Sequence, residues 1–183
     1  MSSVFIYADE SCLGNQYRDR ARPGGAAGIL EYRHPTRGWV RRDYWTSEPD
    51  TTNNRMAIRS AVIPLAALKA PSEVVFTSDS RYLVDGMSRW VHDWRRRGWK
   101  RKGGEIENVE LWKELVEVAA RHRIEWRWVR GHAGHPQNEY ANELAIQAAV
   151  EQSDSGGLQE SRFLVWIGEQ QEKKSRYLSF LDG

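Results

Sequence analysis

The sequence has a single cysteine and lacks any long apolar run. With Cys12 alone, no disulfide can form within the chain, and this usage favours a reducing compartment, so we expect a cytoplasmic protein. A membrane-spanning helix needs about 18 or more consecutive apolar residues, and no such run is present, so we expect no membrane partner. The N-terminal residues enter a strand-like run directly, without the basic and apolar regions of a signal peptide. These absences predict a globular protein that works away from membranes.

The chain also lacks a strong excess of either charge. Lysine and arginine total 27 against 25 acidic residues, and a net charge of +2 does not by itself predict a nucleic-acid partner. The distribution of charge says more, because basic residues and tryptophans alternate between residues 89 and 102. Basic residues alone would usually form a solvated face, and tryptophans alone a core. Interleaved, they favour a surface that binds a nucleic-acid backbone.

The pattern of apolar runs and turns predicts an α/β domain. Three strands are expected first, at residues 4–8, 26–32 and 39–47, followed by a helix over 54–69 that begins after a run of capping residues. A strand at 73–77, two short helices within 81–96, a helix at 107–121, a strand at 124–129 and a helix at 138–150 complete the order. Pro64 lies inside the first helix and should kink it or loosen a turn. The order β-β-β-α-β-α-α-α-β-α predicts a mixed sheet flanked by helices.

Three segments are expected. Residues 1–150 form the domain, 151–161 a linker that is flexible because of its serines and glycines, and 162–183 an apolar C-terminal extension. Phe163, Trp166, Tyr177 and Phe180 are too many aromatic residues for a disordered tail. We expect them to dock on the domain or on a partner, whose identity the sequence leaves open.

Asp9 and Asp79 each follow a buried β run. The ends of strands are where an α/β sheet displays reactive groups, and two carboxylates brought together there need a cation between them. Their hard oxygen ligands suit Mg²⁺ or Mn²⁺. The alternative is that each aspartate caps a helix, and Asp79 before Ser80 is a plausible cap in either case.

Six short motifs occur in order over about residues 4 to 150. They lie at residues 6–15, 51–56, 78–82, 97–100, 108–112 and 131–139, the last reading Gly-His-Ala-Gly-His-Pro-Gln-Asn-Glu. In sequence and spacing the string resembles bacterial ribonuclease H of type 1. The resemblance implies a ribonuclease H-like fold with a mixed five-stranded sheet, and an RNA/DNA hybrid as substrate.

The family cuts RNA with four carboxylates and two divalent ions, and this sequence matches only part of that set. Asp9 and Asp79 match two of the carboxylates, whereas Ala57 stands where glutamate is expected and Asn142 where aspartate is expected. Asparagine still offers a neutral oxygen and alanine offers none, so attraction for two Mg²⁺ or Mn²⁺ ions should be weakened.

Two further residues bear on catalysis. Glu10 stands where the family usually has glycine, and it could replace a lost ligand. Neighbouring residues on a strand point to opposite faces, however, which slightly favours a Glu10 that faces solvent or contacts a loop. His132 matches the loop histidine that the family uses near the attacking water or the departing product; the alternative is a solvated loop residue.

The remaining matches concern substrate. Asn15 and Thr52 match positions that contact a phosphate of the DNA strand. Asn53 and Asn54 match positions that reach the minor groove, where 2′-hydroxyls identify RNA, although either could instead cap the helix. The basic tryptophan segment matches the protruding handle of the family, and its expected contacts are Trp90, Trp94, Arg95, Arg96, Arg97, Trp99 and Lys100.

Three functions are consistent with these features. The first is a ribonuclease H that binds RNA/DNA hybrid and cleaves the RNA strand with metal ions, at full or weakened rate. The alternative is a catalytically inactive binder of hybrid or duplex that has lost its carboxylates by natural or engineered change. The third is an interaction protein that acts through its apolar extension. The groups retained at 9, 79 and 132 favour nucleic acid in the first two, whereas Ala57 and Asn142 favour the binder.

Overall fold

The structure is a computed structural model, and it describes residues 3–14, 16, 19–131 and 134–182. Its strands form one six-stranded sheet in the order β5-β4-β1-β2-β3-β6. The strands are β1 (Ser3–Cys12), β2 (Gly24–His34), β3 (Gly38–Glu48), β4 (Glu73–Ser78), β5 (Arg123–Trp128) and β6 (Gln159–Glu160). The first three pair as an antiparallel meander, and β4 and β5 run parallel to β1. The sheet is therefore mixed, as predicted, with one more strand than the five expected.

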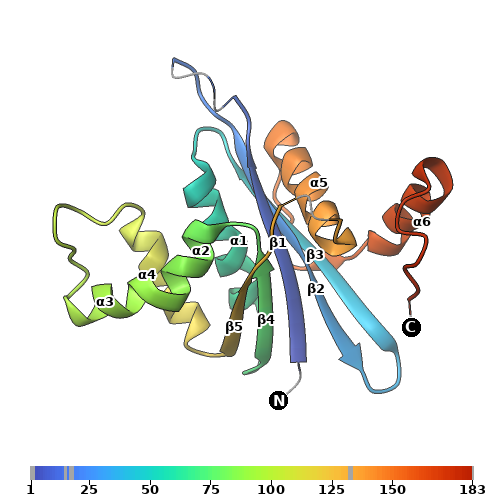
Figure 1. Ribbon diagram of the computed structural model, residues 1–183, viewed down its shortest axis with the longest axis horizontal. Helices are drawn as coiled ribbons and strands as arrows, with labels where there is room; N and C mark the ends of the chain where they lie inside the picture. Colours follow the sequence, from blue (N-terminus) through green and yellow to red (C-terminus); the bar gives the residue numbers. More distant parts are fainter. Residues whose placement is uncertain (1–2, 15, 17–18, 132–133, 183) are drawn as a thin grey trace.

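Helices cover both faces of this sheet (Figure 1). The helices are α1 (Asn53–Ala67), α2 (Arg81–Asp85), the π-helical turn η1 (Gly86–Trp90), α3 (Val91–Arg96), α4 (Val109–Ala119), α5 (Pro136–Glu151) and α6 (Phe163–Lys174). The group from α1 to α4 lies on one side, and α5 lies on the other with α6 beyond it (Figure 1). The predicted order of elements is confirmed through α5.

The main core lies between the sheet and the first group of helices. Alternate residues of the central strands point into it, where they meet the apolar faces of α1 and α4. Its largest fully buried members include Ile6, Leu30, Phe76, Ile58, Leu65, Trp112 and Leu115. This core fixes β1 and β4 side by side, which positions the residues that follow their ends.

On the opposite face, α5 lies directly on the backbone of β2. A Cβ added to Gly25 would lie 2.2 Å from the carbonyl oxygen of Ala145 and 2.8 Å from the amide nitrogen of Ala149. Only glycine at position 25 permits so close an approach. The backbone of α5 consequently packs close to the backbone of the sheet, near the end of β1.

Pro64 lies inside α1, which continues through it to Ala67. Proline has no N–H, so the carbonyl of Ser60, four residues earlier, loses its usual helical donor. The hydroxyl of the fully buried Tyr44 donates to that carbonyl oxygen at 2.7 Å. A tertiary hydrogen bond thus replaces the one that proline removes.

The segment between α5 and α6 runs along the edge strand β3. Ser155 accepts from the backbone N–H of Trp45 at 3.0 Å, and Thr46 donates to Asp154 at 2.7 Å. The pair Gln159–Glu160 then forms β6 against β3. This segment is therefore held against the sheet, whereas its serines and glycines predict a flexible linker. Among the described residues, no helix is both long and apolar enough to cross a membrane.

Candidate metal centre and nucleic-acid interface

The acidic cluster forms where β1 extends beyond the end of β4. The last parallel pair joins Ala8 to Ser78, after which β1 continues through Asp9 and Glu10 against β2 alone. Asp79 is the first residue after β4. One carboxylate oxygen from each of Asp9, Glu10 and Asp79 lies within 4.8 Å of the other two. The predicted meeting of Asp9 and Asp79 is therefore observed, with Glu10 as a third member.

Glu10 reaches the cluster although it points to the other face of β1 from Asp9. Ala8 packs in the main core on the α1 side, and Glu10, two residues later, shares that face. Beyond the end of β4, the free edge of β1 is accessible from both of its faces. Carboxylates from opposite faces can therefore meet beside that edge. The expectation that Glu10 faces solvent is wrong, whereas its alternative form, contact with a neighbouring loop, agrees with the position of Asp79 in the connection after β4.

Glu10 is electrostatically unsatisfied in this position. Its Oε2 atom is buried and has no hydrogen-bond partner among the described residues. Burial, together with repulsion from Asp9 and Asp79, raises the pKa of Glu10 well above its ordinary value. A buried carboxylate without a donor is costly unless a cation neutralises it.

Asn142 completes the cluster from α5. Its Nδ2 donates to Oδ2 of Asp9 at 3.0 Å, while the backbone N–H of Glu10 donates to the other oxygen of Asp9 at 2.8 Å. An amide at 142 thus orients Asp9, whereas an aspartate there would repel it. Ala57 is fully buried in the main core and contributes no polar side-chain atom. Three carboxylates, one unpartnered oxygen and an adjacent amide suit a hard divalent cation such as Mg²⁺ or Mn²⁺.

The loop after β5, together with Trp128 on β5 and Arg81 on α2, borders the cluster. A Cβ at Gly131 would lie 2.7 Å from Oδ2 of Asp79, so the loop after β5 touches this carboxylate through a residue without a side chain. The indole N–H of Trp128 donates to the carbonyl of Asp79 at 2.9 Å, and the guanidinium of Arg81 lies 3.7 Å from the centre of its ring. Sequence reasoning missed Arg81 and Trp128, although Trp128 closes an alternating strand. His132 lies outside the described residues.

The start of α1 presents the predicted groove residues. Thr52 is the N-cap of α1, its hydroxyl accepting from the backbone N–H of Arg55 at 3.2 Å. Asn53 and Asn54 are exposed in the first turn and are not the cap, so the capping alternative for them is wrong. The side chains of Asn53 and Asn54 are therefore not used to cap α1. Asn15 lies outside the described residues.

The handle combines an exposed basic surface with a half-buried aromatic support. Arg95, Arg96, Arg97 and Lys100 are exposed. The rings of Trp90 and Trp94 contact each other at a tilt, Trp90 packs edge-on with Tyr82, and Trp94 packs edge-on with Trp112. Trp94 and Trp99 also pack against the main core. The tryptophans therefore hold the handle to the domain, while the cations extend into solvent.

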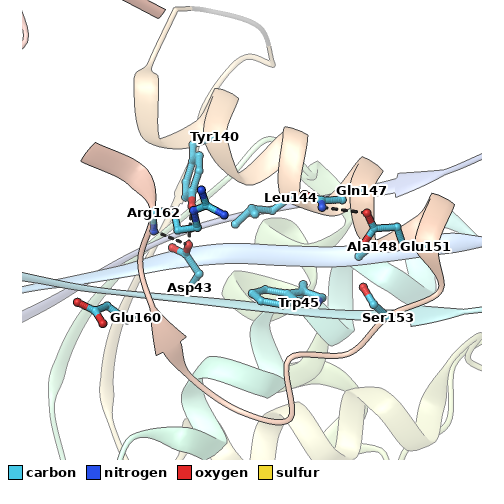
Figure 2. Close-up of a pocket in the computed structure, with 10 residues that line it drawn as sticks. All are labelled: Asp43, Trp45, Tyr140, Leu144, Gln147, Ala148, Glu151, Ser153, Glu160 and Arg162. Atoms are coloured by element: carbon cyan, nitrogen blue, oxygen red, sulfur yellow. Dashed lines mark hydrogen bonds between the residues drawn. The ribbon is translucent and has the colours of Figure 1, made fainter. Parts of the chain in front are cut away.

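A separate cavity of about 180 Å³ lies between β3 and α5. Figure 2 shows the buried Asp43 at one end of it, where it accepts from the hydroxyl of Tyr140 and from the backbone N–H of Arg162. The ring of Trp45 and the side chain of Leu144 line the rest. These contacts join β3, α5 and the start of α6.

Comparison with known proteins agrees with this geometry. A family model described as RNase H matches residues 1–150. Ribonuclease H of Shewanella halifaxensis is 42% identical over 160 residues, covering 85% of this chain and 93% of that protein. Ribonuclease H of an Escherichia coli strain is 41% identical over 151 residues, covering 82% of this chain and 91% of that protein.

Among solved structures, LC9-RNase H1 is similar to this chain throughout. It is described as a type 1 RNase H with the type 2 active-site motif, and its crystal structure matches with 55% identity and a TM-score of 0.88. The match covers 96% of this chain and 85% of that one. Together with the match over the domain and the identity to curated relatives, this shows that the chain belongs to the ribonuclease H family.

Proposed function

We propose that this protein is a metal-dependent ribonuclease H that cleaves the RNA strand of RNA/DNA hybrids. The observation that carries the proposal is the meeting of Asp9, Glu10 and Asp79 at the end of β4. Glu10 supplies there the negative charge that Ala57 does not. In this proposal the carboxylate of Glu10 on β1 takes the place of the glutamate that is missing at position 57, so the site keeps three carboxylates.

The residues of the cluster divide the work of holding metal. Asp9, Glu10 and Asp79 provide charged oxygens, and Asn142 orients Asp9 and offers a neutral oxygen. Bound divalent ions would activate the attacking water and stabilise the leaving oxygen. The loop at Gly131 borders Asp79, so the adjacent His132 is proposed to act on water or product beside the metals.

Substrate contacts are proposed for three surfaces. The exposed cations Arg95, Arg96, Arg97 and Lys100 would neutralise backbone phosphates, above the packed rings of Trp90, Trp94 and Trp99. Asn53 and Asn54 would reach the minor groove, where 2′-hydroxyls distinguish RNA from DNA. Asn15 and Thr52 would contact a phosphate of the DNA strand.

The relative LC9-RNase H1 supports an active site over a depleted one. That protein is described as carrying the type 2 active-site motif in a type 1 enzyme. A relative this similar with a motif foreign to its own type favours a rearranged carboxylate set in this chain also. The inactive binder is the second candidate, and the neutral residue at position 142 is the observation in its favour.

A cleavage assay tests the proposal. The chain is incubated with an RNA/DNA hybrid labelled on the RNA strand, with Mg²⁺, with Mn²⁺ and with a chelator. We expect RNA fragments with either metal and none with the chelator, and an Asp79→Asn variant should lose most of the activity. Intact RNA with both metals, from protein that binds the hybrid, would favour the inactive binder.

A further inference from the structure

The C-terminal part of the chain packs on α5 and not on the main core. We call residues 162–182 the C-terminal brace. Phe163 and Trp166 are buried, and their ring centres lie 5.4 Å from that of Tyr140 on α5. The indole N–H of Trp166 donates to Oε2 of Glu143, also on α5, at 2.7 Å. This hydrogen bond to a charged acceptor is directional and specific.

A second connection runs from the end of the brace to the first turn of α5. Asp182 accepts from the guanidinium of Arg41 at 2.7 Å, and the same guanidinium donates to Glu31. The other oxygen of Glu31 accepts from the side-chain amide of Gln137 at 3.1 Å. Arg41 and Glu31 are both buried, so solvent screens this chain of contacts little. The brace therefore reaches α5 at its start and at its middle.

The underside of α5 meets both small and large residues of β2. It rests on Gly25; Ala27 shares that face of β2, and so does Ile29, which is buried with Tyr140 in the cluster that the brace completes. Small residues allow close approach, but they present few side chains that interlock with a helix and prevent sliding. Where the contact is made by Gly25 and Ala27, the lateral position of α5 depends also on what lies beside the helix. Figure 1 shows α5 between the sheet and α6.

The position of α5 matters because the helix carries Asn142 to the candidate metal centre. Glu143, which the brace holds, is the next residue along the helix. The loop that borders Asp79 at Gly131 leads into the first turn of α5, where Gln137 lies. A displacement of about 1 Å at a reacting centre can lower a rate about a hundredfold, so a small slide of α5 would be felt there.

We propose that the C-terminal brace sets the position of α5 and thereby the position of Asn142 beside Asp9. Trp166 is then a positioning residue that acts through Glu143 and α5. The inference rests on the proposed function of the acidic cluster as a metal centre. It assigns the C-terminal extension a role in that centre beyond the stability its aromatic rings provide.

The test uses the full chain and the change Trp166→Phe, which keeps an aromatic ring at this position but removes the indole N–H together with part of the ring system. We measure Mn²⁺ affinity by calorimetry without substrate, and kcat and KM on a labelled RNA/DNA hybrid. Mn²⁺ affinity and kcat should fall about threefold to tenfold, somewhat less than the tenfold to hundredfold typical for partners of a ligand itself, with KM unchanged. Glu143→Ala should behave like Trp166→Phe, whereas Glu143→Gln, which still accepts from the indole, should retain wild-type values. Leu178→Ala, at an exposed position of the brace, is the matched control and should change nothing.

A double-mutant cycle separates positioning from general stability. In an Asn142→Ala background, Trp166→Phe should have no further effect on Mn²⁺ affinity, because the group that it positions is gone. An equal loss with and without Asn142 would overturn the proposal, as would wild-type affinity and kcat in Trp166→Phe. Mn²⁺ binding without cleavage by the wild type would refute the nuclease function alone, and the cycle would still decide the role of the brace. No Mn²⁺ binding by the wild type would refute both.

Discussion

At the scale of single residues, the candidate centre differs from the family pattern at two linked positions, 57 and 10. Ala57 removes a carboxylate on the α1 side of the sheet, and Glu10 brings one to the same side from β1. Strand alternation correctly places Asp9 and Glu10 on opposite faces. The alternation does not reveal that β4 ends at Ser78, however. Beyond that point the edge of β1 is unpaired on the β4 side, so both carboxylates can reach it. That length difference depends on tertiary pairing and could not be read from the residues alone.

The charge of Glu10 should destabilise the metal-free protein. Its pKa is raised in the folded state, so between the ordinary and the raised value the folded state holds the proton more tightly than the unfolded state does. Stability therefore falls as pH rises through that window, and the loss persists at neutral pH. Glu10→Gln should raise the free energy of unfolding at pH 7 with chelator, because the neutral amide carries no charge to be buried beside Asp9 and Asp79.

Urea unfolding at several pH values checks this expectation. The difference between Glu10→Gln and the wild type should shrink as the pH falls below the raised pKa, and Mn²⁺ should stabilise the wild type more than the variant. A variant less stable than the wild type at pH 7 without metal would show that Glu10 is not under electrostatic stress.

At the scale of elements, most helices and strands follow from apolar patterning, and their extents follow from pairing. Polar residues at the end of β1 carry no strand signal, yet Cys12 still pairs with Gly24. Serine and glycine between α5 and α6 predict flexibility, but the edge of β3 offers hydrogen-bond partners that order the segment. Local composition cannot report such a partner.

The hydrogen bond from Tyr44 to Ser60 should be needed only because of Pro64. Tyr44→Phe leaves a buried carbonyl without a donor and should lower the free energy of unfolding by about 1–3 kcal/mol. In a Pro64→Ala background the backbone N–H restored at position 64 should serve Ser60, so Tyr44→Phe should cost clearly less. Denaturant unfolding of the four proteins measures this coupling, and strictly additive losses would disprove it.

The handle should contribute salt-dependent affinity. Replacing Arg95, Arg96, Arg97 and Lys100 with alanine should weaken hybrid binding and reduce the log-log salt slope by about 0.9 for each phosphate that is no longer neutralised. Fluorescence titration over a range of salt concentrations measures that slope. Lys173→Ala/Lys174→Ala on α6 is the matched control and should leave it unchanged. An unaltered slope in the handle variant would mean that these cations are only a solvated face.

At the scale of the whole molecule, the residues that the structure describes form two apolar clusters. The sequence predicts the main one from the faces of α1 and α4. The second joins Ile29 and Tyr140 to the brace, and the excess of aromatic residues after residue 162 is its only signal. The sequence leaves open which surface those residues cover, because docking depends on a face of α5 that patterning does not define. Asn142 of α5 donates to Asp9 in the candidate centre, while Tyr140 and Glu143 of the same helix contact the brace.

Phe163 should carry much of the stability of this second cluster. It is fully buried between Tyr140, Trp166 and Phe180, with Arg41 stacked over its ring. Phe163→Ala should lower the free energy of unfolding by about 3–5 kcal/mol. Leu178→Ala, on the exposed side, should change it by less than about 0.5 kcal/mol. Equal effects of the two changes in thermal and urea unfolding would show that the brace is not packed as described.

The most direct test of the account is metal-dependent cleavage of an RNA/DNA hybrid by the wild type and by Glu10→Gln, with binding of the hybrid measured in parallel. The variant keeps the size of the side chain and removes only its charge. On the proposal that Glu10 replaces the carboxylate absent at position 57, cleavage should be present in the wild type and should fall at least about a hundredfold in the variant, with hybrid affinity retained. Cleavage that survives Glu10→Gln undiminished would contradict the account, since the centre would then function with two aspartates and an asparagine alone.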